Sequence, residues 1–309
     1  MTINKAHIAG VSFAIIFGFT FMFSKTALSY VSPLGLIAYR FLIAFVGFEL
    51  IRRFKIVKIR FSLSHFKPLF YVAAFQPVLY FLFETYGINY TTSGEAGMMI
   101  ALIPIVVSIM SAIILKEKPK PIQYGFIGLS VFGVIYIQIS KAPTGIEGET
   151  IGFLLLFLAV VSAAAYNIAS RSASKTLKPY EVTYFMMLSG AVIFNILYIT
   201  QLSFQSRALD YIINLGHVEL ILPILYLGII ASIIAFFLMN YALGQLEAHV
   251  ISIYANLATV TAVIAGAVFL NEPIYRYHII GASLIIIGVY GTVRTNRKRR
   301  KIMNSTIKG

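Results

Sequence analysis

The sequence predicts an all-α integral membrane protein with ten transmembrane helices, arranged as two inverted five-helix repeats with both termini in the cytoplasm. Three observations lead to this prediction: ten apolar segments of membrane-spanning length, a bias of lysine and arginine toward alternate connections, and a second half that repeats the first. A bilayer core is about 30 Å thick and takes about 20 helical residues to cross. Backbone amides in lipid must be satisfied within their own segment, so each crossing is expected to be a helix.

Ten segments meet this length requirement and fill most of the 309 residues. We expect transmembrane helices near residues 7–28, 33–51, 68–89, 96–115, 122–140, 150–170, 180–200, 218–241, 248–270 and 277–295. The longest polar connection between them, residues 201–217, leaves no room for a soluble domain. The first segment has no small-residue cleavage site after it, so we interpret it as a retained span and not as a signal peptide.

The composition agrees with a membrane protein. Hydrophobic residues make up 59% of the chain, charged residues only 12%, and the mean hydropathy is +0.86. A soluble domain carries roughly 25% charged residues. Cysteine is absent, which excludes disulfides, thiolate metal sites and thiol nucleophiles. Tryptophan is also absent, so an aromatic belt at the membrane interfaces must come from the 19 tyrosines.

The lysines and arginines that give the chain its net charge of +14 are expected to lie mainly on one side of the membrane. When the N-terminus is placed in the cytoplasm, 20 of the 25 lysines and arginines fall on the cytoplasmic side, and this bias orients membrane proteins. The expected divisions are a first repeat at 1–141, a second, inverted repeat at 146–296, and a basic cytoplasmic tail at 297–309 that faces anionic lipid. This placement of charge favours a lipid bilayer, and no nucleic acid, as the partner.

The repeat is visible as constant offsets. Lys25 and Arg171 each end a span, Pro33 and Pro179 each open the next, and both pairs are 146 residues apart. Later in each half the offset is 155, for Tyr86 and Tyr241, Leu102 and Leu257, Glu117 and Glu272, and Gly133-Val134 and Gly288-Val289. Five spans is an odd number, so the second half is inverted relative to the first. Inverted repeats are typical of transporters and place the substrate at the repeat interface near the membrane midplane.

These residues also resemble a known family. The first half has a Gly-Phe span ending in Lys25, then Pro33-Leu34 with Arg40, then Leu102 and Pro104 before Leu-x-Glu at Glu117, and the second half repeats this order to Glu272. The pattern resembles the EamA-type carriers of the drug/metabolite transporter superfamily over residues 6–295. The resemblance implies movement of small metabolites, often amino acids, across the inner membrane by alternating access. The second half departs from the pattern, because Thr259 stands in place of Pro104 and Met186 in place of Arg40.

We predict a substrate site between the third, fourth, eighth and ninth spans. Polar residues recur at helical spacing there, so that each set lies on one helix face. Polar groups at membrane depth need partners, which a substrate or water can supply. The predicted substrate-binding residues are Gln76, Tyr80 and Glu84 on the third span, Asn240 and Tyr241 on the eighth, and Ser252, Asn256 and Thr259 on the ninth.

Arg40 and Glu84 are charged residues at similar membrane depth, where charges are costly and usually face protein or water. Three interpretations stay open. Arg40 snorkels to the outer headgroups, the two residues form a structural ion pair, or they contact substrate or a coupling proton. Glu117 and Glu272, which follow spans, are expected to fix loops.

The predicted function is a secondary transporter that moves small organic metabolites, amino acids or related compounds, with export as the expected direction, in the bacterial inner membrane. The alternative is a translocator of lipids or lipid-linked metabolites. A membrane enzyme is less favoured, because the sequence has no His-Glu-x-x-His helix, Gly-x-Ser-x-Gly turn or phosphate-binding loop. We expect no cofactor and no metal. A proton is the candidate coupling ion, and both a monomer and a homodimer stay open.

Overall fold

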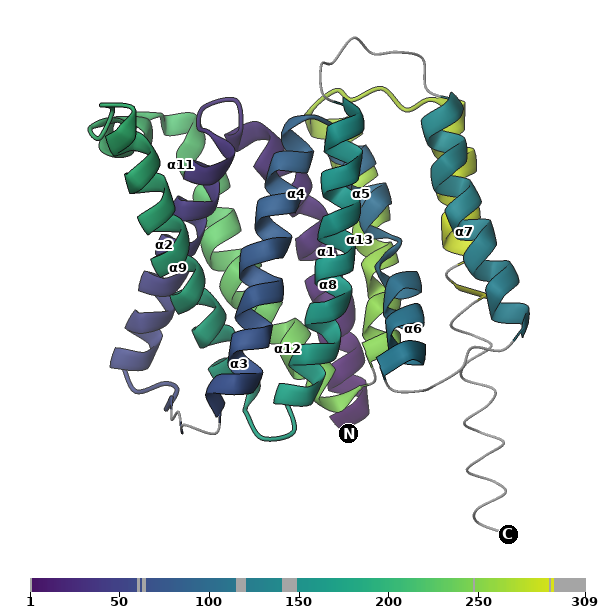
Figure 1. The fold of residues 1–309 in the computed structure, drawn as a ribbon, viewed down its shortest axis with the longest axis horizontal. Helices are drawn as coiled ribbons and strands as arrows, with labels where there is room; N and C mark the ends of the chain where they lie inside the picture. Colours follow the sequence, from purple (N-terminus) through teal and green to yellow (C-terminus); the bar gives the residue numbers. More distant parts are fainter. Residues whose placement is uncertain are drawn as a thin grey trace.

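The protein is a bundle of long apolar helices (Figure 1). The computed structural model describes residues 2–59, 62, 65–114, 121–140, 149–246, 248–288 and 290–291, and these contain helices and turns but no strand. The helices are α1 Thr2–Ala27, α2 Pro33–Arg53, α3 Phe66–Ala73, α4 Tyr80–Asn89, α5 Ser93–Ile100, α6 Ile103–Ile114, α7 Pro121–Ser140, α8 Glu149–Ala173, α9 Pro179–Phe204, α10 Asp210–Ile213, α11 Val218–Leu225, α12 Phe236–Gln245 and α13 Ala248–Phe269. A last helix runs over Arg276–Gly288.

Seven helical stretches in the described residues are long and apolar enough to cross a bilayer. They are Lys5–Ala27, Pro33–Arg53, Phe66–Asn89, Ser93–Met110, Thr150–Ala173, Pro179–Phe204 and Val218–Gln245. The other three predicted segments coincide with shorter apolar helices at Tyr124–Ile137, Leu257–Phe269 and Arg276–Gly288. The fold is therefore that of an all-helical integral membrane protein.

Local sequence signals set where the helices begin. Ser32 precedes α2, its side-chain oxygen accepts from the Gly35 amide at 3.3 Å, and Pro33 occupies the first helical position. Thr92 and Glu95 form a reciprocal capping box at the start of α5. These caps satisfy amides at helix ends that would otherwise lack a partner.

Three predicted spans are interrupted, where the sequence indicated continuous helices. A π-helical turn, η2 Ala74–Leu79, joins α3 to α4, and a longer π-helical segment, η4 Tyr226–Ala235, joins α11 to α12. Within η2, Gln76 has φ −153° and ψ 113°, so the chain kinks beside Pro77, which has no amide hydrogen to donate. A turn at residues 101–102 separates α5 from α6.

The helices of the two halves are interleaved in the bundle (Figure 1). The most extensive packing joins α2 to α9, α1 to α13, α4 to α8, and α5 to α13. Small residues allow close approach, as is common between membrane helices. At Gly18 of α1, an added Cβ would lie 2.7 Å from the carbonyl oxygen of Ala258 on α13, so only glycine fits.

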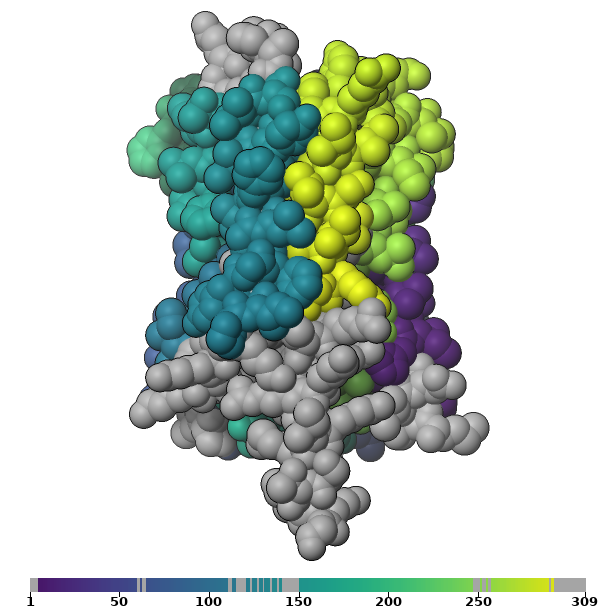
Figure 2. Space-filling model, turned by 90° about the vertical axis from the view of Figure 1, so that its right-hand side faces the viewer, coloured from purple at the N-terminus to yellow at the C-terminus, as the bar shows by residue number. Residues whose placement is uncertain are grey.

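Helix α7 and the last helix lie side by side along one edge of the bundle (Figures 1 and 2). Their contact is close at two glycines: an added Cβ on Gly133 would lie 2.9 Å from the carbonyl oxygen of Gly281. This pairing joins the fifth predicted segment to the tenth.

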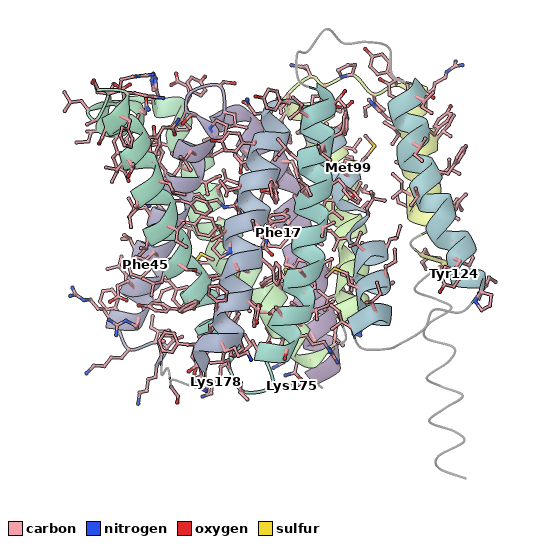
Figure 3. All side chains as sticks on the ribbon, in the orientation of Figure 1. Phe17, Phe45, Met99, Tyr124, Lys175 and Lys178 are labelled. Carbon is pink, nitrogen blue, oxygen red and sulfur yellow. The ribbon has the colours of Figure 1, made fainter. Side chains whose placement is uncertain are left out.

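The two ends of the bundle differ in charge. Lys175 and Lys178 lie at the end where α1 begins (Figure 3), which we call the basic end. At the opposite end, Glu272 accepts from the Ser93 amide at 2.8 Å, from the Ser93 hydroxyl at 2.8 Å and from the Gly94 amide at 3.0 Å. A carboxylate at a helix N-terminus is favourable, so Glu272 ties the loop after α13 to the start of α5. Glu117, for which a loop-fixing role was also expected, lies outside the described residues.

The connection predicted at 201–217 contains more structure than its polarity suggested. Helix α9 extends to Phe204, and the short helix α10 follows. The Tyr211 hydroxyl donates to Asn195 Oδ1 at 2.6 Å, and the Tyr39 hydroxyl donates to the Tyr211 carbonyl oxygen at 2.7 Å. These bonds hold α10 against α2 and α9.

Candidate functional site

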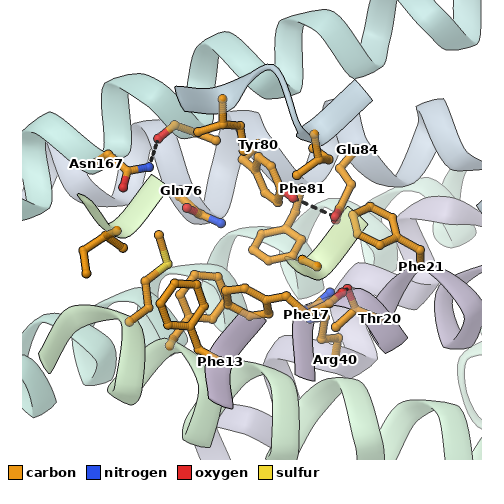
Figure 4. Close-up of a pocket in the computed structure, with 17 residues that line it drawn as sticks. Phe13, Phe17, Thr20, Phe21, Arg40, Gln76, Tyr80, Phe81, Glu84 and Asn167 are labelled. Carbon is orange, nitrogen blue, oxygen red and sulfur yellow. Dashed lines mark hydrogen bonds between the residues drawn. The ribbon is translucent and has the colours of Figure 1, made fainter. Parts of the chain in front are cut away.

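A cavity lies in the centre of the bundle, lined by residues from α1, α2, η2, α4, α5, α6, α8, α12 and α13 (Figure 4). It measures about 60 Å³, which is room for a few water molecules. Most of its wall is apolar, and its aromatic members are Phe13, Phe17, Phe21, Tyr80, Phe81 and Phe236. Its other polar members are Thr20, Arg40, Gln76, Glu84 and Asn167. An apolar chamber with a few polar groups is the usual form of a small-molecule site.

Arg40 projects from α2 into this cavity and is only 4% exposed. Its Nε donates to the Ser232 hydroxyl at 2.9 Å, and its guanidinium lies 4.3 Å from the ring centroid of Phe81. A buried cation over an aromatic face is attracted by the ring quadrupole. The guanidinium is therefore held inside the bundle, between α4 and η4, and does not extend to the surface.

Glu84 enters the cavity from α4 and is 3% exposed. Its Oε1 accepts from the Tyr80 hydroxyl at 2.8 Å, one helical turn earlier (Figure 4). Its Oε2 is buried without a hydrogen-bond partner. Arg40 donates to Ser232 and not to this oxygen, so the carboxylate keeps an unused acceptor at the cavity.

The kink in the third span brings Gln76 to the same cavity as Tyr80 and Glu84. The sequence placed these three residues on one helix face from their spacing of four. The structure brings them together, but across a π-helical turn and not along a regular helix.

The residues predicted on the eighth span lie elsewhere. Asn240 is fully buried, and its Oδ1 accepts from the Tyr166 hydroxyl at 2.8 Å and the Ser170 hydroxyl at 2.7 Å. Its Nδ2 donates to the Thr183 hydroxyl at 3.0 Å. All its polar atoms are thus used in joining α12 to α8 and α9, and Asn240 is not among the cavity residues. Tyr241 is half-buried, stacks on Phe237, and is also not a cavity residue.

The residues predicted on the ninth span are only partly described. Thr259 donates to the Gly97 carbonyl oxygen at 2.8 Å and so joins α13 to α5. The side chains of Ser252 and Asn256 lie outside the described part of the structure. Helix α13 contributes Ile251 and Ala258 to the cavity wall.

Sequence reasoning missed the contribution of α1 and α8. Phe13, Phe17 and Phe21 of α1 form one aromatic wall, and Asn167 of α8 adds an amide. The internal repeat was the signal that could have pointed to Asn167. Asn167 and Phe21 are 146 residues apart, so they occupy equivalent positions in the two halves, and the structure places both in the cavity wall. The substrate site was predicted from polar residues on the third, eighth and ninth spans, so neither the aromatic residues of α1 nor Asn167 of α8 was included.

The described residues contain no group of three or more His, Asp or Glu side chains that could hold a metal ion. The cavity instead offers one cation, one carboxylate and two amides within aromatic walls. Such a set can bind a small polar organic molecule through charge and hydrogen bonds.

Comparison with known proteins gives the family. The model of the EamA-like transporter family matches twice, over residues 4–139 and 150–294. The uncharacterized transporter YcxC of Bacillus subtilis is 35% identical over 298 residues, which cover 96% of each chain. An uncharacterized transporter of Archaeoglobus fulgidus is 27% identical, covering 90% of this chain and 94% of the relative. The probable amino-acid metabolite efflux pump of Escherichia coli is 23% identical, covering 97% and 98%.

A solved crystal structure superposes with a TM-score of 0.66 over 93% of this chain and 97% of the other, at 18% identity. It therefore supports the fold alone. The double match of the family model and the coverage of the bacterial relatives together show that this chain is a multi-pass membrane protein that belongs to the EamA-like transporter family.

Proposed function

We propose that this protein is a secondary transporter that exports small organic metabolites, amino acids or related compounds, by alternating access, and that the central cavity is its substrate site. The observation that carries the proposal is the cavity itself, where a buried cation and a carboxylate with an unused oxygen meet aromatic walls in a chain of a transporter family. The name of the Escherichia coli relative favours amino-acid metabolites as the first compounds to test.

The internal repeat supports this placement of the site. Five pairs of cavity residues occupy equivalent positions in the two halves: Phe17 and Ala163, and Phe21 and Asn167, at an offset of 146, and Phe81 and Phe236, Glu84 and Met239, and Ile103 and Ala258, at 155. An inverted repeat has its axis where equivalent residues converge, and transporters bind substrate there. We therefore propose ten membrane spans in two inverted halves, with the cavity on the axis.

The positive charges support the orientation. Arg52, Arg53, Lys175 and Lys178 belong to the connections that the lysine and arginine bias assigns to the cytoplasm. We propose that the basic end of the bundle faces the cytoplasm. Glu84 and Arg40 then lie in the outer half of the membrane, and Asn167 in the inner half.

Alternating access requires the cavity to grow, because its present volume admits only a few waters. A substrate that reaches the cavity displaces these waters and supplies a partner for Glu84 Oε2. The substrate-binding role proposed for Gln76, Tyr80 and Glu84 follows from their place in the wall.

Flux into and out of proteoliposomes tests the proposal. Purified protein is reconstituted, loaded with radiolabelled amino acids and related amines, and followed with and without an imposed pH gradient. Facilitated flux of at least one compound is expected, and a response to the gradient would identify a coupling proton, for which Glu84 is the buried carboxylate at the cavity. Flux equal to that of protein-free liposomes for every compound would contradict the transporter proposal.

A further inference from the structure

Asn167 has one polar atom that the protein leaves unused. The residue is 2% exposed and lines the cavity. Its Nδ2 donates to the carbonyl oxygen of Ala163, one turn earlier on α8, at 2.7 Å (Figure 4). Its Oδ1 is buried without a hydrogen-bond partner.

The orientation of this amide is fixed by chemistry. Turning it over would place Oδ1 against the Ala163 carbonyl oxygen, and two acceptors cannot bond to each other. The free atom is therefore the carbonyl oxygen, which can only accept. Buried polar groups without a partner are rare in native proteins, and each calls for an explanation.

Asn195 is a second asparagine whose side-chain amide bonds to its own helix, and it can be compared with Asn167. Its Nδ2 also donates to the carbonyl oxygen one turn earlier, that of Ala191, at 2.7 Å. Its Oδ1, however, accepts from the Tyr211 hydroxyl at 2.6 Å. The bond to the helix backbone therefore does not by itself explain a free Oδ1, and the partner that Asn167 lacks has to come from the cavity.

Asn167 lies at the far side of the cavity from the charged residues. Figure 4 shows Asn167 on one side of the view, Arg40 and Glu84 on the other, and Phe17 and Phe81 between them. The internal repeat agrees with this separation. Asn167 of the second half is equivalent to Phe21 of the first half, and Figure 4 shows Phe21 beside Glu84, on the other side of the cavity from Asn167. A ligand that reaches both ends has a charged group and a second polar group separated by an apolar body.

We propose that Asn167 is a specificity-determining residue, whose Oδ1 accepts a hydrogen bond from an N–H or O–H group at the end of the transported compound remote from Arg40 and Glu84. The inference rests on the proposed transport function and adds the chemistry that the cavity selects. A compound without that donor leaves Oδ1 desolvated and unpaired. Leaving a buried acceptor unpaired lowers binding by about 5- to 100-fold.

Pairs of probes that differ in one donor test the inference. We would use threonine and valine, tyrosine and phenylalanine, and tyramine and phenethylamine, each as a substrate for proteoliposome flux and as a ligand in thermal-stability measurements on purified protein. The parent is expected to prefer the donor-bearing member of each pair that it accepts by about 5- to 100-fold. Asn167→Leu, which keeps the size and removes the acceptor, should bring that ratio close to one.

The control is Ser162→Ala, on the same helix. Ser162 is 5% exposed and donates to the Leu158 carbonyl oxygen at 2.8 Å, but it is not a cavity residue. This variant should keep the parental ratio. If Asn167→Leu does not accumulate in membranes, Asn167→Ala serves instead, because alanine also removes the acceptor and suits a helix.

The outcomes separate the two proposals. A parent that discriminates within no accepted pair, or a leucine variant that keeps the parental ratio, overturns the role of Asn167 and leaves the transport function standing. A parent that neither moves nor is stabilised by any probe overturns the proposed function, and this inference with it.

Discussion

Lys25 and Arg171 make the same contact in the two halves of the chain, at opposite ends of the bundle. Lys25 Nζ donates to the carbonyl oxygens of Ile88, at 3.0 Å, and Thr91, where α4 ends. Arg171 Nη1 donates to the carbonyl oxygen of Leu246, where α12 ends. Lys25 and Arg171 are 146 residues apart and Thr91 and Leu246 are 155 apart, the offsets of the internal repeat. Each cation satisfies carbonyls at a helix C-terminus and lies at its negative end.

Removing either cation should therefore destabilise the protein. Lys25→Met and Arg171→Met each leave helix-end carbonyls without a charged donor, at a cost of about 1–2 kcal/mol each. We expect a lower midpoint of thermal unfolding in detergent for both variants. The exposed Lys175 gives the matched control, since Lys175→Met should leave the midpoint unchanged. Midpoints of the two variants equal to that of the control would show that the contacts do not stabilise the fold.

The proposed orientation is open to direct labelling, because the chain has no native cysteine. Single cysteines at Lys55 and Gln205, which are both exposed, should react with a membrane-impermeant maleimide from opposite sides of the membrane. In intact cells only the cysteine at 205 is expected to react, and the cysteine at 55 only after lysis. Reaction of both from outside would contradict the proposed ten-span topology.

The buried charges at the cavity should be coupled. Arg40→Met leaves the Glu84 carboxylate in an apolar setting without a nearby cation, and an uncompensated buried charge costs about 3–5 kcal/mol. We expect the double variant Arg40→Met/Glu84→Gln to regain part of the lost stability, measured as yield from membranes and as thermal midpoint. Losses that add in a double-mutant cycle would show that the two residues act independently.

Tyr80 and Asn240 should respond differently to the loss of hydrogen bonds. Tyr80→Phe removes only the hydroxyl that donates to Glu84 in the cavity wall. Substrate flux in proteoliposomes should therefore fall, while membrane expression stays at the parental level. Asn240→Leu leaves the Tyr166 and Ser170 hydroxyls without their acceptor and takes away the donor to the Thr183 hydroxyl, and a buried unpaired group costs about 1–3 kcal/mol. Its main effect should be on thermal stability, with the substrate preference of the remaining protein unchanged. A changed preference in Asn240→Leu would place that residue in the substrate site after all.

The sequence predicted the structure best where a single physical requirement, such as backbone hydrogen bonding in lipid, determines the local conformation. Apolar length predicts helices because lipid offers the backbone no partner, and the spacing of Gln76, Tyr80 and Glu84 predicts a shared face. It was less informative where a polar side chain has several neighbours to choose from. Asn240 fits a cavity face by its spacing, but inside a bundle a helix meets other helices on most sides, and its partners Tyr166 and Thr183 are far away in sequence.

The same limit applies to Arg40. Its depth in the membrane could be counted from Pro33, but its contact with Ser232, 192 residues later, depends on how η4 packs against α2. The π-helical turns were also not predictable from apolar periodicity, since η4 has an uninterrupted apolar sequence apart from Ser232.

The π-helical segments at η2 and η4 have a mechanical consequence. At the repeat offset of 155, residues 74–79 correspond to 229–234, so each half of the chain has an irregular turn at the same place in its third span. A π turn departs from the regular backbone hydrogen-bond ladder, and bends in helices concentrate at such points. If the protein works by alternating access, as proposed, we expect the half-helices on either side of each π-helical segment to tilt separately, α4 relative to α3 and α12 relative to α11. Bending at these two segments next to the chamber would then make space for a substrate.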